Sequence, residues 1–237
     1  MFASDGTSRR GFLGQVLGAT AVAGLTAGEA GAAAQQPSTA DAWIGEVKGT
    51  HRCLFDFPQH KNGFPLLHIL NYINTYNTAY KTTPGQVGAV GTFYALGTES
   101  SISLAFNDTI WAKYKLGEYL KLKDAAGRAY TRNVFYRPTK EDGHVLMQAV
   151  QAPPMPALAD AMVALGIENL QKMGTKFLLC NNALGAWILE LEARGKGKAA
   201  DIEKDLRANI LPGVTTVPAM VIAIEKAQAA GIRYNRQ

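Results

Sequence analysis

Cysteine, histidine and long hydrophobic runs are scarce in this chain, and each scarcity excludes a kind of site. The 237 residues include two cysteines, Cys53 and Cys180, and four histidines that lie far apart in sequence. No metal-type cysteine pair and no His-x-x-x-His spacing occurs, so we expect no metal site. The chain also has no Gly-x-Ser-x-Gly elbow, P-loop or Gly-x-Gly-x-x-Gly fingerprint. We therefore expect no cofactor either.

Charge is modest and is not gathered into blocks. The formal net charge is +5, with 18% charged and 47% hydrophobic residues, which is ordinary for a globular protein. No basic stripe interleaved with aromatic residues appears, so we do not expect nucleic acid as a partner. The roughly 200 residues that follow the N-terminal segment are enough to bury one hydrophobic core.

The first 34 residues have the pattern of an export signal. Two adjacent arginines, Arg9-Arg10, precede an apolar run rich in Gly and Ala over 11–27, and three alanines follow at 32–34. This predicts a twin-arginine signal peptide over 1–34, export through the twin-arginine translocase and a periplasmic protein. A single membrane anchor is the alternative. The run is shorter than the roughly 20 strongly apolar residues of a span, so we expect no stable membrane span.

Short apolar strands alternate with helical segments after a polar linker over 35–49. The expected strands cover 51–57, 87–94, 175–180, 214–217 and 231–234, and the expected helices cover 64–80, 107–119, 157–173, 181–194, 199–209 and 219–230. Gly88 and Gly91 indicate close approach of a helix or ligand to the second strand. The stretch 121–156 reads as loops or a hairpin. The alternation predicts one α/β domain over 50–237, with a parallel sheet covered on both faces.

Polar residues at the ends of strands are the first candidates for a site, because ligands of parallel sheets collect beyond the carboxyl ends of the strands. The candidates are Asp56, Tyr94, Cys180 with Asn181 and Asn182, and Val217-Pro218. Cys180 stands where a strand gives way to a helix, so its sulfur can face the positive helix end, which favours the reactive thiolate. The alternative is a small buried hydrophobic residue that fills the strand end.

The remaining chemistry-bearing residues have structural explanations beside functional ones. Cys53 begins one strand and Cys180 ends another, so a disulfide between them is not expected, and we take Cys53 as buried and inert. Asp108 and Trp111 share one face of the 107–119 helix, for which Asp108 or Thr109 is a plausible N-cap. This helix is either a lid over the site or a capped helix whose tryptophan joins the core. We expect the histidines at the surface.

Three groups of motifs resemble the DsrE/DsrF-like family. The run Lys176-Phe177-Leu178-Leu179-Cys180-Asn181-Asn182-Ala183-Leu184 is similar to the family's cysteine strand, which leads into a helix. Leu54-Phe55-Asp56 and the Asn-containing segment 70–76 resemble its first strand and first helix. The segments 211–218 and 228–234 resemble its closing strand-helix-strand. The likeness covers roughly 50–94 and 157–234, which leaves about 95–156 as an insertion.

The resemblance implies a flavodoxin-like three-layer sandwich with a mostly parallel sheet, assembled as a trimer or hexamer. It further implies a persulfide on Cys180, exchanged with a sulfur-donor or redox partner protein. In that role the Asn181 and Asn182 amides would stabilise the charge, while Asp56 and Tyr94 would shape the pocket. The export signal, the insertion and the lack of a second cysteine nearby in sequence depart from the family.

Two functions of different classes therefore stay open. One is an exported carrier of a small sulfur species on Cys180. Since no second catalytic group is identifiable, its activity would at most be sulfurtransferase-like. The other is a non-catalytic oligomeric ligand-binding or scaffold protein, in which Cys180 is structural and the insertion makes subunit or partner contacts.

Overall fold

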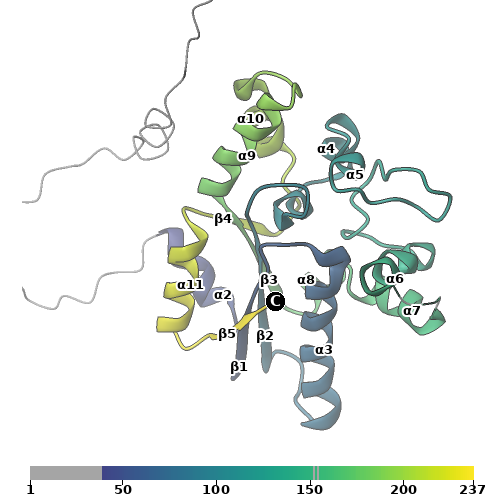
Figure 1. Ribbon diagram of the computed structural model, residues 1–237. Helices are drawn as coiled ribbons and strands as arrows, with labels where there is room; N and C mark the ends of the chain where they lie inside the picture. Colours follow the sequence, from purple (N-terminus) through teal and green to yellow (C-terminus); the bar gives the residue numbers. More distant parts are fainter. Residues whose placement is uncertain (1–38, 152, 154) are drawn as a thin grey trace, which may run out of the picture. The chain divides into compact units, whose positions relative to one another are not determined.

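Five parallel strands form one sheet in a computed structural model of the protein, which describes residues 39–151, 153 and 155–237 (Figure 1). The strands are β1 (His51–Asp56), β2 (Val87–Phe93), β3 (Thr175–Cys180), β4 (Val214–Val217) and β5 (Arg233–Arg236). Their order is β4-β3-β2-β1-β5, and every neighbouring pair is parallel. All five expected strands are present, the last of them two residues later than predicted. The signal predicted over 1–34 lies outside the described residues.

Helices connect the strands, as the alternating pattern predicts. The α-helices are α2 (Ala42–Glu46), α3 (Phe64–Ala79), α4 (Asp108–Lys113), α5 (Leu116–Tyr119), α6 (His144–Val150), α7 (Pro156–Ala164), α8 (Ile167–Lys172), α9 (Asn181–Ala193), α10 (Ala199–Ala208) and α11 (Met220–Ala229). Short 3-10 helices cover Thr39–Asp41, Lys61–Gly63, Ser101–Ala105 and Lys140–Gly143. The fold is α/β, with helices flanking a parallel sheet as in a flavodoxin-like three-layer sandwich.

Two apolar clusters, one on each face of the sheet, make up the core. The larger cluster joins strand residues such as Phe55 and Phe177 to α3, α8, α9 and α10. The smaller cluster joins Leu54, Leu178 and Val217 to α2 and α11. From β1 to β4 each strand is added on the same side of the previous one, whereas β5 returns to the other side of β1. Right-handed crossovers then require α11 to cover the face opposite α3, which is where it lies.

The segment expected as a linker over 35–49 is structured in its described part. Residues Thr39–Asp41 form a 3-10 turn that leads directly into α2. The Trp43 side chain is buried in the smaller apolar cluster, and Val47 is buried with it. The polar composition and the proline of this segment indicate a linker and do not reveal α2. A single buried residue, Trp43, anchors the helix to the sheet, and one apolar residue gives no periodic pattern.

Two of the expected helices are each interrupted. The 107–119 helix divides at Lys115, whose φ of 53° is left-handed, into α4 and α5. The 157–173 helix divides at Gly166, where an added Cβ would lie 2.7 Å from Pro138 Cδ. The true N-cap of α4 is Asn107, which accepts hydrogen bonds from Thr109 and Ile110, so neither Asp108 nor Thr109 is the cap.

The insertion over about 95–156 belongs to the main core. It contributes Ile110, Trp111, Leu116 and Val145, all fully buried, to the cluster on the α3 face. Its later part contains α6 and one isolated antiparallel bridge between Lys123 and Ala129, rather than a full hairpin. The insertion therefore extends the larger cluster instead of forming a separate lobe.

Candidate functional site

The Cys180 sulfur lies between the first turns of two helices. Cys180 ends β3 and is the N-cap of α9, and its Sγ accepts the Ala183 backbone N–H at 3.4 Å. The same Sγ accepts the N–H of Met220, the first residue of α11, at 3.3 Å. Only 5% of the residue is exposed. Two otherwise unpaired helix N–H groups thus share one sulfur acceptor, and both helix dipoles favour negative charge there.

This position is the topological switch point of the sheet. The chain leaves β3 through α9, which packs into the cluster on the α3 face, and leaves the adjacent β4 through α11 on the opposite face. Cys180 is paired in register with Val217, the last residue of β4. Adjacent strands whose connections diverge to opposite faces open a crevice at their carboxyl ends, where ligands of such sheets bind. The expected placement of Cys180 at a strand end therefore falls on this crevice.

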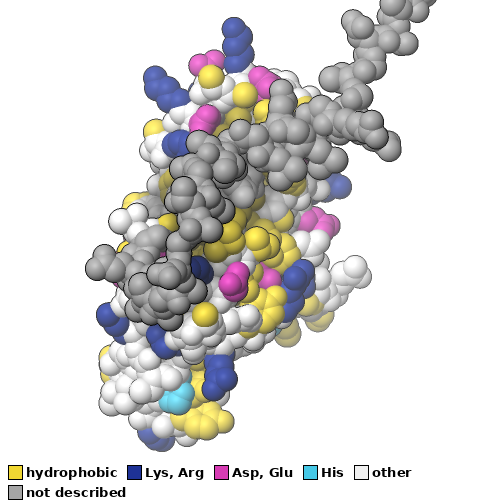
Figure 2. Space-filling view, turned by 90° about the vertical axis from the view of Figure 1, so that its left-hand side faces the viewer, with side chains coloured by type: hydrophobic (Ala, Val, Ile, Leu, Met, Phe, Trp, Pro, Cys, Tyr) yellow, Lys and Arg dark blue, Asp and Glu magenta, His cyan; other side chains and the backbone are white. Residues whose placement is uncertain are grey.

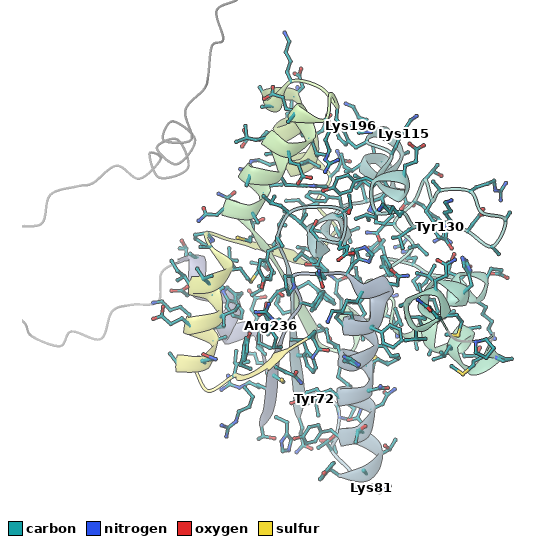
Figure 3. The ribbon with its side chains drawn as sticks, viewed as in Figure 1. Tyr72, Lys81, Lys115, Tyr130, Lys196 and Arg236 are labelled. Carbon is teal, nitrogen blue, oxygen red and sulfur yellow. The ribbon has the colours of Figure 1, made fainter. Side chains whose placement is uncertain are left out.

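A second polar group surrounds the Asp56 carboxylate at the end of β1. Tyr94 donates its hydroxyl to Asp56 Oδ1 and Tyr234 donates to Oδ2, each at 2.8 Å. Arg236 Nη1 stands 3.5 Å from Oδ2, and Figure 3 shows Arg236 at the end of β5. Asp56 is only 1% exposed, so its charge is balanced by these donors rather than by water.

The two groups lie on one face and at one edge of the sheet. Strand residues two apart point the same way, and Asp56 shares the face of Leu54, which packs toward α2 and α11. Cys180 and the partly buried Tyr94 belong to the same apolar cluster. Phe93 pairs with Leu179. The residues that follow them, Tyr94 and Cys180, therefore lie beside each other. Tyr94, the first residue after β2, therefore lies between the cysteine and the carboxylate.

The electrostatics keep the Tyr94 phenol protonated. Burial raises the pKa of Tyr94 well above its ordinary value, and the hydrogen bond to the Asp56 carboxylate raises the pKa further. Tyr94 is therefore a permanent donor at physiological pH, and it has no capacity to act as a base there. The arrangement can hold charge and orient a small group, but it offers no second nucleophile.

Asn181 and Asn182 do not supply the hydrogen bonds that Cys180 receives. The side-chain oxygen of Asn181 accepts from Arg207 Nη1 at 3.1 Å. The backbone N–H of Asn182 donates to the Pro218 carbonyl at 3.2 Å, which ties α9 to the end of β4. The donors to the sulfur are instead the backbone groups of Ala183 and Met220, described above.

Asp108 and Trp111 are structural and lie on the other face of the sheet. Trp111 is fully buried in the larger cluster and donates Nε1–H to the Ser103 carbonyl at 3.1 Å. Asp108 Oδ1 accepts the Asn133 backbone N–H at 2.8 Å, which fixes the following loop. The interpretation of this helix as a lid over the Cys180 site is wrong, and the alternative of a capped helix with a core tryptophan holds.

Cys53 differs from Cys180 although both are buried and free. Among the described residues its Sγ is hydrogen-bonded only to the adjacent Leu54 carbonyl, at 3.8 Å, and burial raises the pKa of its thiol to about 11. It belongs to the cluster on the α3 face, so the two sulfurs face opposite sides of the sheet. A disulfide between them is absent, as expected.

Three residues of this edge escaped prediction from the sequence. Tyr234 and Arg236 share a face with Asp56 because Leu54 pairs with Tyr234 and Asp56 pairs with Arg236. The two-residue spacing of Tyr234 and Arg236 in the last strand shows that both lie on one face of the sheet. It points to Asp56 only if β5 is known to lie beside β1. The Met220 N–H is a backbone group, which residue types do not reveal.

Comparisons with known proteins give no relative: no family model, no curated protein and no solved structure matches the chain. Within the described residues, no group of three or more His, Cys, Asp or Glu side chains is arranged to hold a metal ion. No helix in that same part of the chain is long and apolar enough to cross a membrane.

Proposed function

We propose that the protein is an exported, DsrE-like carrier of a small sulfur species, held as a persulfide on Cys180. The observation that carries the proposal is the pair of backbone N–H groups, from Ala183 and Met220, that meet at the Cys180 sulfur. Hydrogen bonds of this kind favour an anionic sulfur over a neutral thiol. The position at the switch point of the sheet supports the same role.

The transfer step is a thiol-disulfide-type exchange without net oxidation. The Cys180 thiolate attacks the outer sulfur of a donor persulfide, R–S–SH. A bond forms between Sγ and that sulfur, the donor's S–S bond breaks, and R–S⁻ leaves with the electron pair. The terminal proton stays on the transferred sulfur until solvent removes it. Because Cys180 is nearly buried, the donor reaches the sulfur through the small exposed part of the residue, with both N–H groups in place.

The test is the mass of the intact protein after exposure to a low-molecular-weight persulfide, glutathione persulfide. We expect the wild type to gain the mass of one sulfur atom, which dithiothreitol removes. The Cys180→Ser variant should gain nothing. The Cys53→Ser variant is the matched control, since it removes the other buried thiol, and it should load like the wild type. Loading that persists in Cys180→Ser would refute the proposal.

A second candidate is the oligomeric ligand-binding or scaffold protein in which Cys180 is structural. The observation that favours it is the apolar surface of α11, where Val221 is 74% and Ile222 is 49% exposed. Figure 2 shows this face, on which apolar side chains gather between charged ones. Apolar patches of this kind mark contact surfaces in many proteins. A trimer or hexamer would bury them.

The oligomer is tested by light scattering coupled to gel filtration. We expect an assembled wild type and a smaller species for Val221→Glu, because a charge on α11 would be buried in the interface. Lys226→Gln is the control, because Lys226 is an exposed residue of the same helix. The substitution changes a charged residue there without placing a new charge on the apolar surface. An oligomer whose Cys180 cannot be loaded with sulfur would favour the scaffold function over the carrier.

A further inference from the structure

A separate cavity of about 560 Å³ lies where four segments meet beyond the end of β1. These segments are the turn before α3, the Thr98–Glu99 loop, the turn after α5 and the end of α6. The lining residues are Gln59, His60, Lys61, Asn62, Phe64, His68, Thr98, Glu99, Leu120, Lys121, Ala149 and Val150. Cys180 is not among them, so this cavity is distinct from the sulfur site.

The lining of the cavity carries more positive than negative charge. Lys61 and Lys121 both line it, and neither forms an ion pair with any described residue. The one carboxylate of the lining, Glu99, already accepts a hydrogen bond from Gln59 Nε2 at 2.9 Å. Burial lowers the pKa of His60 to about 4, so its ring adds no charge at neutral pH. Two lysines that form no ion pair with the described residues thus line a cavity that has one partly satisfied acid.

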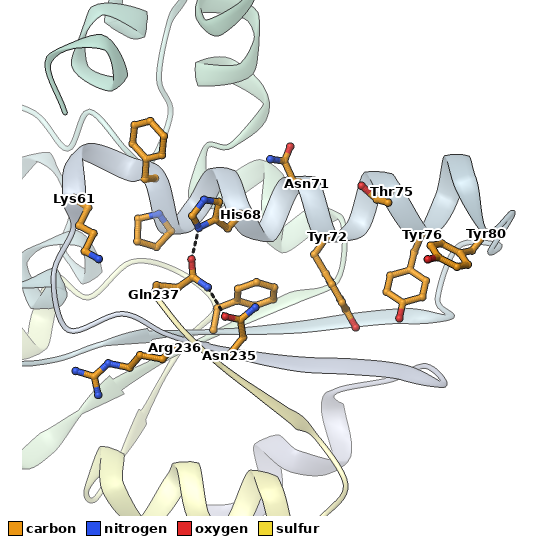
Figure 4. Close-up of a pocket in the computed structure, with 13 residues that line it drawn as sticks. Lys61, His68, Asn71, Tyr72, Thr75, Tyr76, Tyr80, Asn235, Arg236 and Gln237 are labelled. Carbon is orange, nitrogen blue, oxygen red and sulfur yellow. Dashed lines mark hydrogen bonds between the residues drawn. The ribbon is translucent and has the colours of Figure 1, made fainter. Parts of the chain in front are cut away.

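The α3 helix adds a partial positive charge to the same place. Its N-cap Gly63 offers no side-chain acceptor, but the Phe64 N–H donates to the Lys61 carbonyl and Pro65 has no N–H, so the helix contributes the positive end of its dipole rather than free donors from these two residues. Its first residue, Phe64, lines the cavity. The positive end of a helix dipole beside cations that form no ion pair with the described residues is an environment in which anions are stabilised. Lys61 extends from the turn just before this helix, where it also lines a neighbouring cavity of about 770 Å³ formed by α3 and the last residues of the chain (Figure 4).

A buried hydrogen-bond donor in the lining has no partner in the part of the chain that the structure describes. His60 is 4% exposed, and its Nδ1 accepts the Asn62 backbone N–H at 3.0 Å, which places the ring proton on Nε2. The Thr98 backbone lies close enough to favour the protonated ring, yet among the described residues no acceptor stands in hydrogen-bonding geometry to Nε2. An unsatisfied buried donor is unfavourable unless a ligand or a rearranged loop supplies the acceptor.

The other side of the cavity is apolar. Phe64, Leu120, Ala149 and Val150 contribute hydrocarbon surface, and half of the Val150 side chain is exposed. The volume lies in the range of small-molecule pockets, which combine apolar walls with a few polar groups. A ligand that suits this lining has one anionic group and an apolar body.

We propose that this cavity binds a small organic anion, whose charged group lies between Lys61 and Lys121 and whose apolar body packs against Leu120 and Val150. The site does not depend on the sulfur chemistry proposed for Cys180. A carrier that failed to load sulfur would leave this binding unaffected, and the reverse also holds.

The probe for the test is anilinonaphthalene sulfonate, a fluorescent organic anion, with phenylnaphthylamine as its uncharged counterpart. In the full chain we expect the doubly substituted Lys61→Gln/Lys121→Gln variant to bind the sulfonate about tenfold more weakly at low salt. Binding of the neutral amine should be unchanged. Added salt should weaken sulfonate binding to the wild type without affecting the amine.

Two further variants locate the probe. Lys61, Lys121 and Lys81 all have a left-handed backbone, with φ of 39°, 58° and 57°. Lys81→Gln is therefore the matched control, because Lys81 lies at the opposite end of α3 (Figure 3). It should bind the sulfonate like the wild type. Ala149→Trp fills the cavity and should weaken both probes. The proposal is overturned by unchanged sulfonate binding in the double lysine variant, by equal losses for both probes there, or by unchanged sulfonate binding in Ala149→Trp.

Discussion

Removing the ionisable ring of His60 should flatten the acid dependence of folding stability. The ring is buried, and burial lowers its pKa from the ordinary 6.5 to about 4, an effect that the Thr98 carbonyl partly offsets. Below pH 6.5 the unfolded chain takes up a proton that the folded chain refuses. The full stability is therefore present above pH 6.5, falls as the pH drops, and the loss is complete below about pH 4.

The size of this effect follows from the shift. At 1.36 kcal/mol for each pKa unit, the whole loss is about 3 kcal/mol, of which about 2 kcal/mol has occurred by pH 5. His60→Asn abolishes the titration, while its side-chain oxygen can still accept the Asn62 N–H that Nδ1 accepts in the native protein. The smaller side chain lowers stability at every pH, so the informative quantity is the change with pH.

Urea unfolding at pH 8, 7 and 5 measures that change in both proteins. We expect the difference in unfolding free energy between wild type and His60→Asn to stay constant from pH 8 to 7. It should then shift by about 2 kcal/mol in favour of the variant at pH 5. A difference that stays constant from pH 8 to 5 would refute the assignment of His60 as a buried, neutral imidazole.

Two other substitutions test the packing that positions the site. Asp56→Ala removes the acceptor of two tyrosine hydroxyls, one of them from Tyr234 of β5, and should cost about 3 kcal/mol of unfolding free energy. Amide exchange in β5 should become faster. A cost below about 1 kcal/mol would show that Asp56 does not hold β5 in place. Gly91→Ala places a Cβ 2.5 Å from the Phe177 ring and should cost about 2 kcal/mol in a urea titration, whereas an unchanged midpoint would show that the sheet relaxes freely there.

The sequence predicts the strands well because all five are bounded by turn residues or by the start of a helix. β2 is wholly buried and β1 and β3 are mostly buried, so each contains a short apolar stretch in the sequence. Gly88 and Gly91 predict close approach of a helix or ligand, whereas the close neighbours in the structure are the Lys48 backbone, just after α2, and the Phe177 ring of the adjacent strand. The sequence predicts the last strand over 231–234, two residues before its position in the structure. The four residues of β5 are all exposed, so no alternation of apolar residues marks its ends.

The candidate site could be predicted only where it depends on strand ends. Asp56, Tyr94 and Cys180 were found because the carboxyl ends of parallel strands meet at one edge. Tyr234 and Arg236 were missed because the strand order, which no local pattern encodes, brings β5 beside β1. His60 was expected at the surface, and this is wrong, because the insertion over 95–156 packs over it.

The central claim is that the two backbone N–H groups at Cys180 make its sulfur reactive. Ala183→Pro deletes one of them at the third residue of α9, in the first turn, whose N–H groups have no intrahelical acceptor, and Ala183→Gly keeps it. The most direct test is the alkylation rate of Cys180 in the folded protein at pH 7, followed by peptide mass analysis with Cys53 as internal reference. Losing about 1 kcal/mol of hydrogen bonding should slow Cys180 about fivefold in Ala183→Pro, with Ala183→Gly like the wild type. Equal Cys180 rates in all three proteins would contradict the claim.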